Sequence, residues 1–63
     1  MFMTIIFYDK QKETYQKIGN IVQIEEAQLR SHGHLANFWL LTDFEGMQKS
    51  YPMKWFSIHK IMV

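Results

Sequence analysis

The chain has 63 residues, 48% of them hydrophobic, and a formal net charge of +1 from seven Lys/Arg and six Asp/Glu residues, with no cysteine. A chain of this length forms one domain, residues 1–63, and buries only about 60% of its unfolded surface. The lack of cysteine excludes a disulfide framework and a Cys-based zinc site, and the small net charge gives no field that favours nucleic acid or an anionic membrane.

The first two predicted strands are rich in β-branched and aromatic residues. Residues 4–8, T-I-I-F-Y, form the first strand, and the polar residues 9–12 follow as a turn. Residues 18–24, I-G-N-I-V-Q-I, are predicted as a bend at Gly19-Asn20 that leads into the second strand. Val22 and Ile24 are expected to share one face of it.

Residues 25–30, E-E-A-Q-L-R, contain good helix formers. Because six residues are too few to nucleate a helix alone, we favour an extension of the second strand into a long hairpin over a short helix. Residues 31–34, S-H-G-H, then form the hairpin tip, with Gly33 in the left-handed conformation.

The remaining strands are predicted from residues 37–63. Residues 38–41, F-W-L-L, form a strand. It is followed by a turn in which Asp43 hydrogen-bonds its own following backbone and Gly46 takes a positive φ. Residues 47–51 return and end at Pro52. Residues 53–56, M-K-W-F, are too short for an α-helix and predict a single 3-10 turn before the last strand. Five short strands with regular turns indicate an all-β barrel or sandwich.

Several of these patterns, taken in order, resemble the Src-homology-three family. Residues 6–10, I-F-Y-D-K, stand where that family has A-L-Y-D-Y, and residues 18–24 are similar to its K-G-D-I-I-x-V segment. Phe38-Trp39 resembles its W-W pair, and residues 46–56 resemble its late G-x-x-G-x-[FI]-P-x-N-Y-V segment. The resemblance implies a small five-stranded β-barrel with one 3-10 turn before the last strand.

The resemblance also implies a binding surface. Its groove positions are occupied here by Tyr8, Phe38, Pro52 and Trp55. Together they would form a shallow aromatic trough that accepts a polyproline-type peptide at low entropy cost. The alternative is that these side chains fill a small core. The predicted function is a non-catalytic protein-binding module with a protein or peptide partner and no cofactor.

Two other functions stay open. Aromatic residues beside Lys10, Lys12, Lys49 and Lys54 could stack the bases of a single strand while the ammonium groups follow the phosphates. Alternatively, exposed hydrophobic residues could form a homodimer face in a structural protein.

His32 and His34 have a spacing that can supply two metal ligands, but no third ligand is identifiable, and an exposed loop without metal is expected. No nucleophile with a base, paired carboxylates or phosphate loop is present, so the chain is not expected to be an enzyme.

The apolar residues 1–8 lack the basic region and cleavage site of a secretory signal. No stretch approaches the roughly 18 apolar residues of a membrane helix. We therefore expect a cytoplasmic protein that has no membrane partner. The short, cysteine-free chain that begins with methionine is typical of an accessory or inhibitory protein of a bacterium or mobile element.

Overall fold

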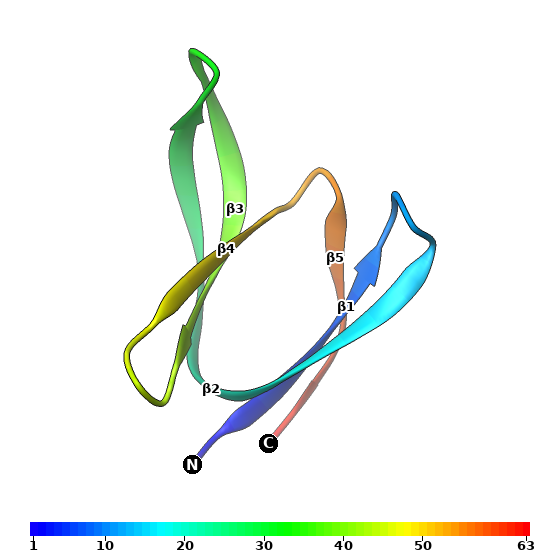
Figure 1. The fold of residues 1–63 in the computed structure, drawn as a ribbon, viewed down its shortest axis with the longest axis vertical. Helices are drawn as coiled ribbons and strands as arrows, with labels where there is room; N and C mark the ends of the chain where they lie inside the picture. Colours follow the sequence, from blue (N-terminus) through cyan, green and yellow to red (C-terminus); the bar gives the residue numbers. More distant parts are fainter.

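The computed structural model describes all 63 residues as five antiparallel strands and their turns, with no helix. The strands are β1 (Met3–Asp9), β2 (Thr14–Ser31), β3 (His34–Asp43), β4 (Gln48–Pro52) and β5 (Phe56–Met62). They form one sheet in the order β4-β3-β2-β1-β5 (Figure 1). The predicted all-β class is confirmed, and each predicted strand overlaps one of these elements.

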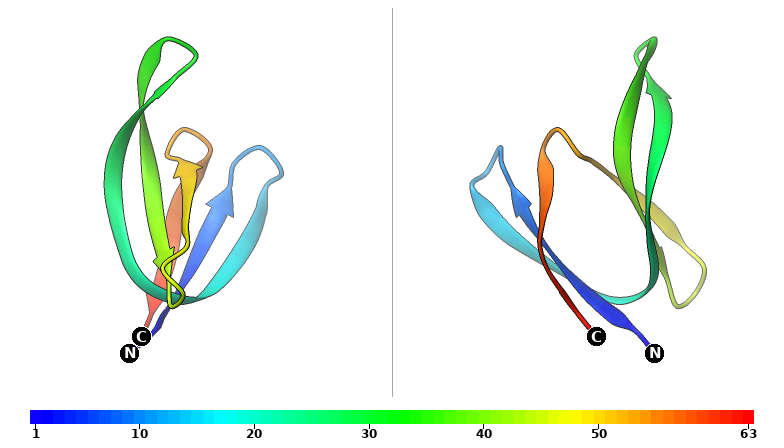
Figure 2. Two further views of the ribbon diagram at one scale, coloured as in Figure 1. Left: turned by 60° about the vertical axis from the view of Figure 1, so that its left-hand side comes forward. Right: turned by 180° about the vertical axis from the view of Figure 1, so that it is seen from behind.

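Strand β2 is bent and belongs to both halves of the sheet. Its first part pairs with β1 as far as Ile21, and its second part, from Ile21 to Ser31, pairs with β3. At the bend, Asn20 has a φ of 59°. Figure 2 shows β2 curving from one half of the sheet to the other. The bend predicted at Gly19-Asn20 is therefore present, and the helix considered for residues 25–30 is replaced by the long β2–β3 hairpin.

The sheet does not close into the predicted barrel. Strands β4 and β5 are its two edges, and no ladder joins them. Closure would require a backbone ladder between β4 and β5. Strand β4 has only five residues, however, and it ends at Pro52, which has no N–H to donate. The prediction is corrected to a bent, open sheet whose principal extents are 37 × 27 × 13 Å.

The core lies between the two halves of this sheet. Its four buried hydrophobic residues come from β1, β2 and β3, and they are Ile5, Phe7, Ile21 and Leu41. The Phe7 ring contacts Tyr51 of β4 and Phe56 of β5, with ring centroids 4.8 Å and 5.7 Å apart. These contacts connect the two edge strands through side chains, although their backbones do not pair.

Val22 does not share the core face with Ile24. Ile21 is 3% exposed and Ile24 packs against the core, whereas Val22 is 43% exposed. The β2–β3 ladder pairs Ile21 with Asp43 but Gln23 with Thr42, so two steps on β2 oppose one step on β3. This β-bulge interrupts the alternation of faces and turns Val22 outward, contrary to the prediction.

The two hairpin turns of the β2–β3–β4 half have the predicted chemistry. His32 and Gly33 have φ values of 51° and 80°, the pair of positive angles that a tight two-residue hairpin turn requires. At the other turn, Asp43 Oδ1 accepts hydrogen bonds from the N–H groups of Glu45 and Met47, each 2.9 Å long. Gly46 has a φ of 83°. The local sequence was therefore sufficient to predict both turns.

Residues 53–55 form the turn between β4 and β5. The Trp55 N–H donates to the Pro52 carbonyl oxygen over 3.1 Å, and the Met53 N–H donates to the Asn37 carbonyl oxygen over 3.0 Å. The structure has a hydrogen-bonded turn here and no segment of 3-10 helix, so that detail of the prediction is not confirmed. The bond to Asn37 fixes the turn against β3.

Candidate functional site

Three of the four residues predicted for binding lie around one groove, which we call the aromatic groove. Phe38 of β3 is directly opposite Pro52 in the β3–β4 ladder. The β4–β5 turn brings Trp55 back beside them, and all three residues line a groove of about 670 Å³. Their side chains come from β3, the end of β4 and the following turn. The groove therefore depends on the bend at Pro52.

The lining of the aromatic groove is mixed, and half of its ten residues are hydrophobic. Leu35, Ala36 and Met53 line it together with the predicted residues. Lys54 Nζ lies 5.0 Å from the centroid of the Trp55 ring, which is within the range of a cation–π contact. This contact positions the indole at the edge of the groove. Trp55 is only partly buried, so its ring remains available to a partner.

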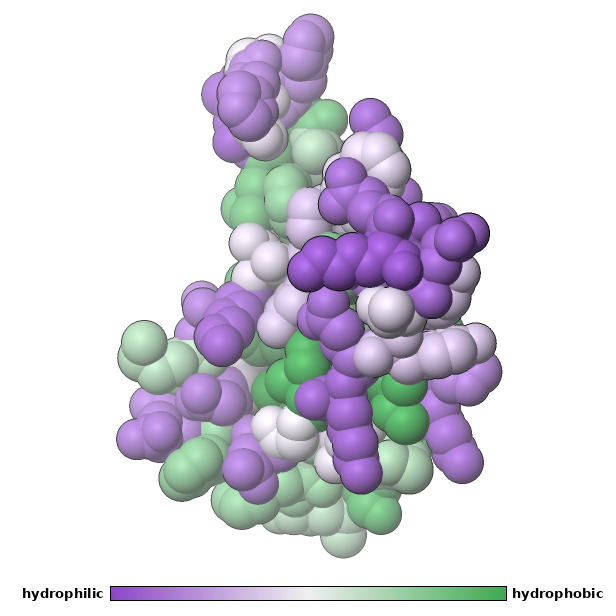
Figure 3. Space-filling model, turned by 45° about the vertical axis from the view of Figure 1, so that its right-hand side comes forward, coloured by the Kyte–Doolittle hydropathy of each residue, from purple (hydrophilic) through white to green (hydrophobic).

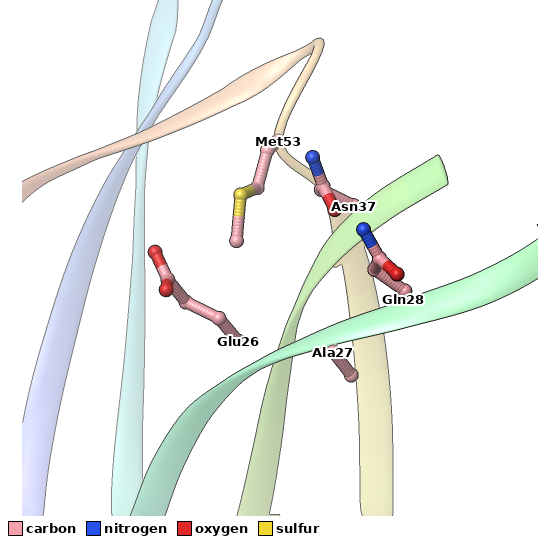
Figure 4. Close-up of a pocket in the computed structure, with 5 residues that line it drawn as sticks. All are labelled: Glu26, Ala27, Gln28, Asn37 and Met53. Atoms are coloured by element: carbon pink, nitrogen blue, oxygen red, sulfur yellow. The ribbon is translucent and has the colours of Figure 1, made fainter. Parts of the chain in front are cut away.

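A second hollow adjoins the groove and brings a carboxylate to it. Glu26 and Gln28 of β2, Asn37 of β3 and Met53 of the turn line this hollow of about 270 Å³. Figure 4 shows the Glu26 and Met53 side chains extending into the same space, with the amide groups of Gln28 and Asn37 side by side. Asn37 and Met53 line both cavities. These two residues join the cavities, but Phe38 and Pro52 face the opposite side of the sheet from Asn37, so the acidic hollow and the aromatic rings meet around the edge of β3 and do not share one face.

Sequence analysis missed this second hollow. The sequence places Glu26 only in the predicted extension of the second strand, and Met53 only in the predicted turn before the last strand. The register of the hairpin pairs Glu26 with Trp39 and Gln28 with Asn37, which places these residues on one face. The position of the tip at Gly33 was the available signal, because counting back from it gives these pairs.

Tyr8 does not line the aromatic groove. It lies on β1, paired with Tyr15 of β2 and Ser57 of β5. Its ring contacts the Tyr15 ring, with centroids 5.1 Å apart. The region is close to the groove, because the Lys10 N–H donates to the Trp55 carbonyl oxygen over 2.8 Å. The structure therefore separates Tyr8 from the other three predicted residues and places it in a neighbouring aromatic cluster.

The lysines considered for nucleic-acid binding come from different parts of the chain, although the Lys10 N–H bonds to the Trp55 carbonyl oxygen and so brings two of these parts together. Lys10 and Lys12 lie in the β1–β2 turn, Lys49 is on β4 and Lys54 is in the β4–β5 turn. The four residues therefore belong to three separate segments of the chain.

The histidine pair lies at the tip of the β2–β3 hairpin. His32 is in the turn and exposed, and its Nδ1 lies 3.1 Å from the Ser31 Oγ. His34 pairs with Ser31 at the start of β3. No group of three or more His, Asp or Glu side chains is arranged to hold a metal ion. The tip therefore offers at most two ligands.

Tyr51 of β4 has a phenol that burial affects. Its phenol packs among core residues, and burial raises its pKa above 10.0. It also lines a small hollow of about 130 Å³ with Ile18, Ile21 and Leu41. Because no charged partner causes the shift, Tyr51 is a core residue and gives no evidence of acid–base chemistry.

The structure has no helix that is long and apolar enough to cross a membrane. No family model matches the chain, and no curated protein or solved structure matches it significantly.

Proposed function

We propose that this chain is a small, non-catalytic protein-binding module of Src-homology-three-like architecture. It would bind an extended segment of a partner protein in the aromatic groove. The observation that carries the proposal is the convergence of Phe38, Pro52 and Trp55 on one groove of about 670 Å³. The five antiparallel strands and the short hydrogen-bonded turn before the last strand support the architecture.

The groove suits an extended, proline-containing segment. The Phe38 and Trp55 rings offer flat apolar surfaces, and a polyproline-type helix packs on such surfaces with little loss of entropy. Aromatic side chains are also the residues that most often dominate binding energy. Exposed hydrophobic residues that line a groove are more informative than scattered ones, and Leu35, which also lines this groove, is 63% exposed.

The adjacent hollow suggests one further feature of the partner. Glu26 carries the negative charge there, next to the amides of Gln28 and Asn37. A Lys or Arg side chain at one end of the bound segment would place its charge near this carboxylate and its donors near the amide oxygens. The partner segment is therefore expected to combine prolines or other apolar residues with a basic residue at one end. Binding would serve to recruit or inhibit the larger partner.

The test is selection of peptides from a displayed random library on the intact chain, with affinities measured for the selected peptides. We expect proline-containing sequences with a Lys or Arg at one end. Trp55→Ala should weaken their binding by at least about tenfold, as for a residue at the centre of an interface. Glu26→Gln should weaken only the peptides that carry the basic residue.

Phe44→Ala is the matched control, because Phe44 is an exposed aromatic residue, 55% accessible, in the β3–β4 turn away from the groove. It should leave peptide affinity unchanged. Selected peptides that bind Trp55→Ala as tightly as the wild type would contradict the proposed site. Circular dichroism of each variant shows whether a loss of binding reflects a loss of fold.

A further inference from the structure

A second surface lies on the outer face of strands β2, β1 and β5, and we call it the tyrosine face. Tyr8 pairs with Tyr15 of β2, and Ile6 pairs with both Lys17 of β2 and Lys60 of β5. Directly opposed residues in a ladder point to the same side of the sheet. These side chains therefore share one face, opposite the face on which Ile5 and Phe7 enter the core.

The rings on this face form a continuous platform. The Tyr8 and Tyr15 ring centroids are 5.1 Å apart, and those of Tyr15 and His59 are 4.8 Å apart. Because β1 lies between β2 and β5 in the sheet, the contact between Tyr15 and His59 crosses over β1. Tyr15 is nevertheless 61% exposed. Because the Tyr15 ring packs across a strand and still stays exposed to water, it belongs to the surface and not to the core.

Cationic residues surround this platform. Lys17 and Lys60 lie on the face itself, and Lys10 and Lys12 are in the β1–β2 turn at its end. All four are exposed. The side of the molecule that carries the β1–β2 turn comes forward in Figure 3, where hydrophilic side chains gather.

Most of the carboxylates lie outside the tyrosine face. Asp9 is 3% exposed and points to the core side, and Glu13 is in the β1–β2 turn. The others lie in the β2–β3–β4 half of the sheet, and they are Glu25, Glu26, Asp43 and Glu45. The small net charge of +1 thus conceals a separation of charge, and no carboxylate lies among the rings of the tyrosine face.

We propose that the tyrosine face binds single-stranded nucleic acid. Bases would stack on the rings of Tyr8, Tyr15 and His59, and the ammonium groups of the four surrounding lysines would contact the flanking phosphates. Proteins that bind single strands without sequence preference combine aromatic stacking surfaces with a positive track for the backbone. An acidic peptide would satisfy the lysines but would leave the exposed rings without flat partners. This site is separate from the aromatic groove and independent of the proposed protein-binding function.

The test is binding of a fluorescently labelled oligothymidylate of about 12 nucleotides to the intact chain, measured by anisotropy. With four lysines involved, the logarithm of the affinity should fall with the logarithm of salt concentration with a slope of about −3. Affinity should therefore drop about 50-fold between about 50 and about 200 mM salt. Tyr15→Ala should weaken binding by about 5- to 150-fold, as expected for the loss of one stacked base. Lys17→Ala should reduce the salt slope by about 0.7.

Two matched variants test whether the effect is local. Phe44→Ala removes an exposed ring, and Lys49→Ala removes an exposed lysine, both outside the tyrosine face. Both should bind the oligonucleotide like the wild type. Absence of binding at low salt, unchanged affinity in Tyr15→Ala, or equal losses in the two control variants would each overturn the proposal. Competition by polyglutamate as strong as that by unlabelled oligothymidylate would also overturn it, in favour of an acidic protein partner. The aromatic groove is tested separately, by measuring the affinity of Trp55→Ala for the selected peptides.

Discussion

The indole Nε1 of Trp39 donates a hydrogen bond to the backbone carbonyl oxygen of Phe56 over 3.0 Å. This bond joins β3 to β5, which are separated by β2 and β1 in the sheet order. The Phe56 ring also contacts Phe7 and Tyr51. Trp39 therefore holds the two halves of the open sheet together, and with them the turn that carries Trp55.

Trp39→Phe tests this connection, because phenylalanine keeps an aromatic ring in this place but removes the N–H donor together with a small part of the apolar surface. The Phe56 carbonyl oxygen would lose its partner, and we expect the free energy of unfolding to fall by about 1–3 kcal/mol. Urea denaturation followed by circular dichroism measures the change. Phe44→Leu, an exposed substitution, should stay within about 0.5 kcal/mol. A Trp39→Phe variant as stable as the wild type would show that the bond between the halves contributes nothing.

The bulge in β2 predicts opposite outcomes for two neighbouring residues. Ile21 is 3% exposed within the core cluster, whereas Val22 is 43% exposed. Ile21→Ala should cost about 2–5 kcal/mol of stability, which is a large share of the stability of so small a domain. Val22→Ala should cost under about 1 kcal/mol, mainly through strand propensity. The urea midpoints of the two variants measure the difference, and similar midpoints would contradict the described register.

The same bulge shows where sequence analysis reached its limit. The strands and the turns at Gly33 and Gly46 could be predicted because each depends on local chemistry: β-branched runs, positive-φ residues and a proline. The outward position of Val22 depends on which strand carries the extra residue. Pairing with β3 decides that, and no local pattern reveals it. The prediction that Val22 and Ile24 share one face was therefore wrong, because the bulge lies between Ile21 and Gln23.

Prediction of the candidate site from the sequence was limited by the same dependence on long-range strand register. Phe38, Pro52 and Trp55 line one groove because one hairpin and one turn connect them. Tyr8 was assigned to the same trough by resemblance, but its pairing with Tyr15 and Ser57 places it in another cluster. Glu26 was missed because its part in the site depends on the approach of Met53 from a turn that is distant in sequence.

Burial of Tyr51 predicts that stability falls in alkali. The pKa of its phenol is raised above 10.0 in the folded chain, so the unfolded chain loses this proton first as pH rises. The stability that depends on the neutral phenol is therefore complete below about pH 10 and is lost as pH rises through the higher folded pKa. The urea midpoint should fall more between about pH 9 and about pH 11 in the wild type than in Tyr51→Phe. Equal pH dependence in the two proteins would remove Tyr51 as the cause.

Gly33 gives a test of the hairpin that carries part of the aromatic groove. Its φ is 80°, and a Cβ built there would meet no atom within 4 Å. Gly33→Ala should therefore cost about 1 kcal/mol through backbone strain alone. Gly33→Val, with a branched side chain, should cost more. Gly19→Ala is the control, because Gly19 does not have a positive φ and its Cβ would sit at an ordinary 3.7 Å from Thr4 Oγ1. Thermal unfolding of the three variants checks the order.

The open edges of the sheet lead to the last prediction, which concerns self-association. Strand β4 is an edge with unpaired backbone groups, and Lys49 is exposed on it. A charged residue on a short edge strand opposes pairing with the edge of another molecule. Lys49→Val removes the charge and adds a strand-forming side chain, so we expect a larger sedimentation coefficient at high protein concentration. Lys49→Gln removes the charge alone and should change it less. If Lys49→Val sediments like the wild type at every concentration, the short length of β4 and Pro52 at its end are sufficient to protect this edge.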